Sequence, residues 1–359
     1  MDKTITILDK EYTQWVKTLV RRYRQCQIKA AVKVNTEQLL FNLSLGKDIA
    51  ERQEENKYGS RFYANLSRDL KKEIPDVEGL SESNIRYCKR FYQLYNQIVE
   101  NLPQLVENLE SRNLPQVVEK LCSIPWGHHR LIIDKCSDNP QKAFFFVSQT
   151  LENGWSRAML QNWIETGLYE RQGKAITNFT TVLPLPDSDL AQEVTKDPYS
   201  FAFAGVRGRY NEKKLKEALL TNITHFLVEL GSGFSYVGRE YRLQIGEQEK
   251  FIDLLFYHLK LRCYVVVEVK IDDFDFPDVG QIGGYIVACN HILKQPDDNP
   301  TIGLLICKKK NGLLAQYSLE SSSQPIAISS YELEQFYPVK VEGALPTIEE
   351  IEEKLNDEE

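Results

Sequence analysis

The 359-residue sequence contains no long apolar run and no paired cysteine motif. Its longest apolar stretches, such as "YVVV" and "IGLLIC", are far shorter than the ~20 residues that a membrane helix requires, and its first residues, "MDKTITILDKEYTQ", lack the apolar core of a signal peptide. The seven cysteines are odd in number, scattered and never spaced C-x-x-C, so they indicate neither a disulfide framework nor a zinc ribbon. We therefore expect a soluble cytoplasmic protein with reduced thiols and no membrane association.

The sequence also lacks an overall excess of basic residues. Its formal net charge of −7 argues against a generally basic surface that would coat a nucleic acid. The charge is unevenly distributed, because residues 1–180 carry 26 basic against 22 acidic residues, whereas residues 181–359 carry 18 against 29. Residues 341–359 alone hold eight acids and one lysine, and we interpret them as an acidic C-terminal tail.

A change of composition divides the sequence into two domains. Residues 176–205 contain three prolines among threonine, aspartate and serine, a composition that disfavours a continuous helix, and we predict a linker there. Residues 1–175 have apolar residues at helical spacing and predict a mainly α-helical domain. Residues 206–340 predict a second domain, of α/β class. The clearest helical segments of the first domain are 11–34, 35–55, 61–74 and 82–100.

Part of the first domain has the pattern of a helix-turn-helix. Residues 65–95 predict a helix, a turn that contains proline and glycine, and a second helix with Ser81 or Ser83 as its N-cap. Basic residues on that second helix, and in the acid-free stretch 17–33, could contact a phosphate backbone. Solvated helix faces give the same pattern, so a DNA-binding surface and an ordinary surface both remain open. The candidate DNA contacts are Arg86, Lys89, Arg90, Arg21, Arg22 and Arg24.

The second domain has a different order of elements. Residues 211–231 predict an amphipathic helix, which Gly231 can terminate. Three strands, a helix and a fourth strand follow, and the predicted order is αβββαβ. These later elements are predicted at 234–245, 250–258, 263–270, 280–294 and 301–308.

Three charged residues lie within the apolar strands of this domain. Strand alternation places Glu268 and Lys270 on one face, and a short hairpin can bring Asp253 beside Glu268. Two carboxylates in an apolar setting repel each other and lose hydration unless a divalent cation such as Mg²⁺ compensates both. A buried salt bridge to Lys270, or a strand face open to solvent, would produce the same pattern of residues.

Several longer strings in the two domains are distinctive. In the second domain they are "KDPYSFAF" (196–203), "FLVELGSGFSYVGREYRL" (226–243), "FIDLLFYHLKLRCYVVVEVK" (251–270) and "GQIGGY" (280–285), and in the first domain "SIPWGHHRLIIDK" (123–135) and "GWSR" (154–157). In these strings and in the αβββαβ order, nearly the whole chain resembles the YhcG-like members of the PD-(D/E)XK nuclease superfamily. The resemblance implies a helical, winged-helix-like N-terminal domain and a restriction-endonuclease-like C-terminal domain.

The resemblance also implies roles for individual residues. Asp253 resembles the metal-binding aspartate of the family, Glu268 its acidic partner and Lys270 its catalytic lysine. Gln281 resembles the glutamine that positions the water or the scissile phosphate, and the backbone carbonyl of Val269 would be a further metal ligand. The implied cofactor is Mg²⁺, for which Mn²⁺ can substitute, and the implied reaction is hydrolysis of phosphodiester bonds.

One position departs from the pattern of the family. Related sequences tend to read "LE-x-AL" in the first core helix and present a glutamate toward the metal, whereas this sequence reads "LKEAL", with Lys216 at that position and Glu217 after it. Glu217 is therefore the candidate metal ligand from this helix, although a helix turns ~100° per residue and Glu217 would reach the metal only if the helix rotated or slipped. The metal stoichiometry and the activity both depend on this position.

Two hypotheses of function follow. The first is a Mg²⁺-dependent nuclease that acts on DNA rather than RNA, in DNA processing or mobile-element defence, with no small-molecule organic cofactor. The second is a catalytically degenerate DNA-binding or scaffold protein that keeps the nuclease fold, and Lys216 is the feature that favours it. Paired cuts would require a homodimer. A zinc cluster of His258, Cys263, Cys289 and His291 matches no familiar zinc spacing and is not expected.

Overall fold

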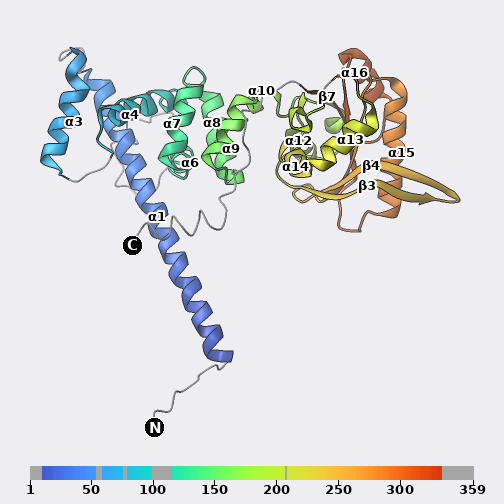
Figure 1. The fold of residues 1–359 in the computed structure, drawn as a ribbon, viewed down its shortest axis with the longest axis horizontal. Coiled ribbons are helices and arrows are strands. Elements are labelled where there is room, and N and C mark those ends of the chain that lie inside the picture. The colour runs from blue at the N-terminus through green and yellow to red at the C-terminus, as the bar shows by residue number, and fades with distance from the viewer. Residues whose placement is uncertain (1–9, 54–58, 76–78, 99–114, 207, 334–359) are drawn as a thin grey trace, which may run out of the picture. The chain divides into compact units, whose positions relative to one another are not determined.

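The computed structural model describes residues 10–53, 59–75, 79–98, 115–206 and 208–333 (Figure 1). These residues form two compact units that divide between Gln161 and Asn162, here called the helical unit and the sheet unit. Every helix within the described ranges is too short or too polar to cross a membrane.

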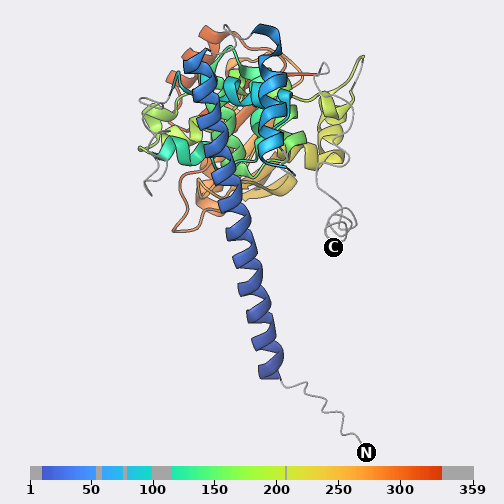
Figure 2. The same ribbon diagram turned by 90° about the vertical axis from the view of Figure 1, so that its left-hand side faces the viewer.

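The helical unit is built on one long helix, α1 (Lys10–Arg52), whose N-terminal half extends away from the other helices of the unit (Figures 1 and 2). The sequence predicts two helices over this range, but neither proline nor glycine interrupts residues 10–45. The Asn35 side chain donates to the carbonyl oxygens of Cys122 and Ile124 and caps no new helix. The other elements are η1 (Gly59–Arg61), α3 (Phe62–Glu73), α4 (Glu82–Tyr95), α6 (Gln116–Leu121), α7 (Trp126–Cys136) and α8 (Pro140–Asn153). Helix α9 (Arg157–Glu165) contains the division between the units.

Helix α4 lies at the centre of this unit. It begins where the sequence predicts, because the Ser81 hydroxyl accepts a hydrogen bond from the Asn84 amide at 3.2 Å. It packs closely on α1, since a Cβ added at Gly46 would lie 2.1 Å from the Cys88 carbonyl oxygen. Helices α3 and α4 lie where the sequence predicts two helices, and one side of α4 is buried in the core of the unit.

The sheet unit contains one mixed seven-stranded sheet. Strands β3 (Phe234–Ile245), β4 (Gln248–His258) and β5 (Cys263–Val269) pair antiparallel, and β6 (Ile302–Cys307) and β7 (Ile326–Glu332) continue the sheet in parallel with β5. The order is β1-β7-β6-β5-β4-β3, and β2 also pairs with β7. The carboxyl ends of β5, β6 and β7 therefore lie at one edge of the sheet.

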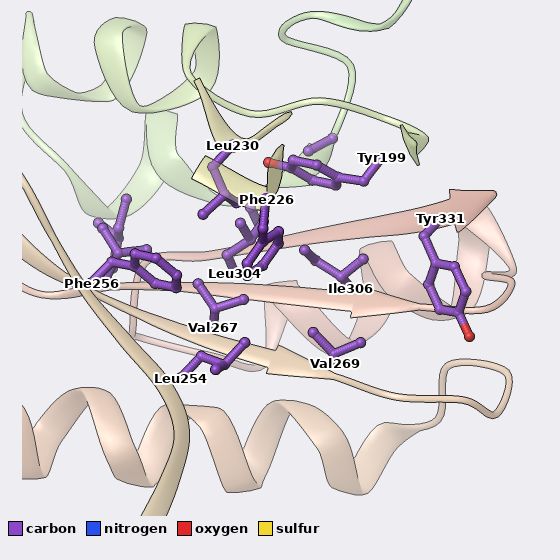
Figure 3. Close-up of a cluster of buried hydrophobic side chains, with 14 of the residues drawn as sticks. Tyr199, Phe226, Leu230, Leu254, Phe256, Val267, Val269, Leu304, Ile306 and Tyr331 are labelled. Atoms are coloured by element: carbon purple, nitrogen blue, oxygen red, sulfur yellow. The ribbon is translucent and has the colours of Figure 1, made fainter. Parts of the chain in front are cut away.

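Helices cover both faces of the sheet. Val267 and Val269 pack on one face against α13 (Glu212–Thr221) and α14 (Ile223–Leu230), as Figure 3 shows for Phe226. Val266 points to the other face, toward α15 (Phe276–Ile292) and α16 (Gly312–Glu320). The predicted αβββαβ order is confirmed, although the first helix breaks at Asn222 into α13 and α14. Helix α16 and strand β7 extend the core beyond the predicted elements.

Residues 176–205, predicted as a linker, belong to the sheet unit. Strand β1 (Ile176–Thr177) pairs with one side of β7, and β2 (Tyr199–Ser200) pairs with its end. Phe179 and Phe201 are fully buried in the same core as α14. The prolines prevent a continuous helix, as predicted, but apolar residues between them still pack. The short helices of this region are α11 (Phe179–Val182), α12 (Asp187–Glu193) and η2 (Ala202–Ala204), and α10 (Leu168–Arg171) precedes it.

Candidate active site

The structure brings the two predicted carboxylates together. Leu254 lies opposite Val267 in the antiparallel pair of β4 and β5, so the adjacent positions, Asp253 and Glu268, are neighbours across the strands. The Asp253 amide donates to Glu268 Oε1 at 3.4 Å. The two acids are 15 residues apart in the chain, and the hairpin places them side by side near the carboxyl end of β5.

Glu268 is almost completely buried, with 1% of its surface exposed. Burial raises the pKa of its carboxyl group, and the negative charge and hydrogen bond of Asp253 raise it further. Among the described residues, no group donates a hydrogen bond to its buried Oε2 atom. A buried, unsatisfied carboxylate oxygen is costly, so this atom is a natural ligand for a cation.

Lys270 and Gln281 lie beside this carboxylate. The Lys270 ammonium is 3.8 Å from Glu268 Oε2 and donates to Gln281 Oε1 at 3.3 Å. Gln281 comes from α15, so the lysine is held between a strand and the helix that covers this face. The four side chains that the resemblance singles out, those of Asp253, Glu268, Lys270 and Gln281, thus converge on one cluster.

Lys216 of α13 completes the cluster with a second positive charge. Its ammonium forms an ion pair with Asp253 Oδ2 and another with Glu212 Oε1 at 2.7 Å. Burial alone would lower the pKa of Lys216, but hydrogen bonds to the two carboxylates outweigh burial and raise it. Sequence reasoning did not find Glu212, although its spacing four residues before Lys216 is a known signal of a helical ion pair.

Glu217 does not join this cluster. Lys216 points to Asp253, and Glu217, one residue on, is exposed because successive helical positions diverge by ~100°. The predicted role of Glu217 as a metal ligand therefore has no support in the geometry. The helix has neither rotated nor slipped to exchange the two residues.

The candidate ligand atoms of this cluster are carboxylate and carbonyl oxygens, which fit a magnesium ion better than zinc. Two neighbouring carboxylates, one with a free buried oxygen, match the preference of Mg²⁺ for a few carboxylate oxygens and retained water. Val269 points its side chain into the core on the opposite face, so only its backbone carbonyl could contribute. Within the described ranges, no group of three or more histidine, cysteine, aspartate or glutamate side chains is placed to hold a metal ion.

The predicted DNA contacts of the helical unit lie on exposed or half-buried positions. Arg86 pairs with Glu82 at 2.8 Å, and Arg90 pairs with Asp134 at 2.8 Å, so two of these charges are already neutralised. Lys89 is half-buried on the same helix, whereas Arg21, Arg22 and Arg24 are exposed on the N-terminal half of α1. Their role in DNA binding stays a prediction.

Comparisons with known proteins match both parts of the chain to known families. Residues 192–346 match the model of the YhcG PDDEXK nuclease domain, and residues 18–171 match the DUF1016 N-terminal domain. The chain thus carries a YhcG PDDEXK nuclease domain that follows a DUF1016 N-terminal domain. It is 29% identical over 292 residues to "Putative nuclease YhcG" of Escherichia coli (strain K12), which covers 77% of each chain.

Two solved structures are also similar to the YhcG-like chain. One is a repair endonuclease from Pyrococcus abyssi, with a TM-score of 0.25, 18% identity and coverage of 36% of this chain and 50% of the other. The second is an EndoMS-dsDNA2 complex, with a TM-score of 0.26, 17% identity and coverage of 36% and 48%. The chain spans about half the length of these structures, and the family assignment rests on the sequence matches.

Proposed function

We propose that this YhcG-like protein is a Mg²⁺-dependent nuclease that hydrolyses phosphodiester bonds of DNA, in DNA processing or mobile-element defence. The observation that carries the proposal is the unsatisfied, buried Oε2 atom of Glu268 beside Asp253, with Lys270 in reach. Membership of a nuclease family supports the reaction class. The choice of DNA over RNA, and of Mg²⁺ over Mn²⁺, belongs to the proposal.

Each residue of the cluster would have a distinct role in the reaction. Asp253, Glu268 and the Val269 carbonyl would hold the ion, which when bound supplies positive charge at the phosphodiester and makes nearby water more acidic. The Lys270 ammonium would stabilise negative charge that develops on the phosphoryl oxygens. Gln281 holds Lys270 in place by accepting its hydrogen bond, and would orient the attacking water or the scissile phosphate.

A second function is favoured by one specific observation. The Lys216 ammonium already neutralises Asp253, which leaves less net negative charge to attract a cation. If this ion pair excluded the metal, the protein would be a DNA-binding or scaffold protein that keeps the nuclease fold without its chemistry. The two functions differ in whether any metal supports cleavage.

Cleavage by the full-length protein tests the proposal. Supercoiled DNA, linear DNA and RNA are incubated with wild type and with Lys270→Ala, in Mg²⁺, in Mn²⁺ and with chelator. We expect cleavage of DNA that needs metal and that falls about a hundredfold or more in Lys270→Ala. Lys260→Ala, in the exposed turn before β5, is the matched control and should cut like wild type. Failure to cut any polymer with either metal would exclude the nuclease function.

A further inference from the structure

A second polar site lies at the same edge of the sheet as the carboxylate pair. A pocket of about 600 Å³ opens at the carboxyl ends of β6 and β7. Its wall contains three consecutive lysines and a single acid, Glu332. The lining residues are Tyr210, Lys308, Lys309, Lys310, Gly312, Ser330, Tyr331, Glu332 and Leu333.

The three lysines of the pocket have different surroundings. Lys310 is half-buried and forms an ion pair with Asp197, whose other carboxylate oxygen accepts hydrogen bonds from Ser330 at 2.9 Å. This ion pair holds Lys310 in the wall of the pocket and neutralises its charge. Lys308 and Lys309 are exposed, and neither forms an ion pair with a described residue. Two positive charges are therefore available to a ligand.

The N-terminus of α16 adds a hydrogen-bond donor to the same pocket. Asn311, its N-cap, accepts from the Leu313 and Leu314 amides through its side chain and from the Ala315 amide through its carbonyl. Among the described residues, the Gly312 amide is the one in this first turn that has no acceptor. Gly312 lines the pocket, and a Cβ added at this residue would meet no atom within 4 Å, so the residue borders open space. Lysines around a free helix N-terminus are suited to bind a phosphate.

Backbone hydrogen bonds connect this pocket to the carboxylate cluster. The Lys270 backbone amide donates to the Ile306 carbonyl at 2.9 Å, and the Lys308 amide donates to the Asp272 carbonyl at 3.2 Å. The segments that follow β5 and β6 thus run side by side. With strands about 4.8 Å apart, β7 lies about 10 Å from β5. This distance corresponds to the rise of about three base pairs along the axis of a duplex.

We infer that the pocket of Lys308, Lys309 and the α16 N-terminus binds a backbone phosphate of the nucleic-acid strand whose cleaved phosphate lies at Asp253 and Glu268. The inference rests on the proposed nuclease function, since it assigns the path of the substrate across the sheet edge. The lysines supply charge, and the Gly312 amide supplies a directed hydrogen bond. Tyr210 and Tyr331, whose hydroxyls are 3.1 Å apart, also line the pocket.

Binding in the absence of metal tests this inference without requiring cleavage. Fluorescence anisotropy with a labelled 20-base-pair DNA duplex in chelator, over a series of salt concentrations, is measured for wild type and for Lys308→Gln/Lys309→Gln. We expect the double variant to bind about tenfold more weakly at 0.1 M salt, and the slope of log affinity against log salt to fall by about two. Thermal unfolding of the variant should match that of wild type, because both side chains are exposed.

The matched control removes two lysines from the opposite edge of the sheet. Lys260 lies in the turn before β5, and Lys294 follows the end of α15. Lys260→Gln/Lys294→Gln should keep the affinity within about twofold and keep the salt slope. The inference that the pocket binds a phosphate would be wrong if the two double variants weakened DNA binding equally, or if Lys308→Gln/Lys309→Gln did not weaken it. A protein that binds DNA through the pocket and cuts nothing would instead refute only the nuclease function.

Discussion

Replacing Lys216 should strengthen metal binding by this protein. In wild type, Asp253 must give up its ion pair with Lys216 before it can bind a metal ion, so the lysine competes with the metal. In Lys216→Gln, the competitor is gone and the carboxylate pair carries one more uncompensated negative charge. In Lys216→Glu, the helix presents a third carboxylate to the same point.

The magnitude follows from how exposed the pair is. The side chains of Lys216 and Asp253 are 18% and 22% exposed, which places the pair between a surface ion pair, worth up to ~1 kcal/mol, and a buried pair, whose disruption costs ~3–5 kcal/mol. We take about 1.5 kcal/mol for the competition, which equals about a tenfold gain in metal affinity for Lys216→Gln. Lys216→Glu should gain about tenfold more.

The assay measures metal binding itself. Titration of the full-length protein with Mn²⁺, with free Mn²⁺ followed by electron paramagnetic resonance, gives the dissociation constant without reference to activity. Lys213→Gln is the matched control, because Lys213 is exposed on the same helix and should leave the affinity as in wild type. The reasoning fails if Lys216→Gln binds Mn²⁺ no more tightly than wild type, or if Lys213→Gln produces the same gain.

Three further predictions concern stability. Glu229→Ala should cost about 3–5 kcal/mol in urea unfolding of the sheet unit, because it leaves the buried Arg171 guanidinium without its carboxylate; an unchanged midpoint would contradict this. Gly233→Ala should cost about 1–3 kcal/mol, since Gly233 has φ +98 and a Cβ would lie 2.8 Å from the His258 ring; thermal unfolding measures this. Burial lowers the pKa of His129 to about 4 from 6.5, so the unfolded state binds the proton first and the helical unit should lose about 3 kcal/mol as pH falls through that window. A pH series should show a smaller loss of stability in His129→Gln than in wild type, and the loss that remains includes that of His128, whose pKa burial also lowers.

The central hairpin could be predicted from the sequence because its signals are local. Alternation in β5 sends Val265, Val267 and Val269 to one core and Val266 to the other, as the structure confirms. The same alternation places Glu268 beside Asp253, since a short hairpin fixes the register between adjacent strands.

The features that sequence reasoning missed depend on contacts between distant residues. Strand β1 pairs with β7, so Ile176 lies opposite Ile328. A strand as short as β1 or β2 has too few residues to show a periodic pattern in the sequence. The composition of residues 176–205 predicts only that they form no long helix, and it does not predict that they pair with the sheet. The pairing of Lys216 with Asp253 likewise requires α13 to dock at a set height on the sheet, which no local pattern fixes.

The attachment of 162–205 to the sheet determines where this chain can be cut. A truncated gene product that starts at residue 192, where the match to the nuclease domain begins, would lose β1 and the guanidinium that neutralises Glu229. It should precipitate or be degraded even though every residue of the carboxylate cluster is retained. Expression of the C-terminal half should therefore begin near Asn162, and a missing activity in shorter pieces would say nothing about catalysis.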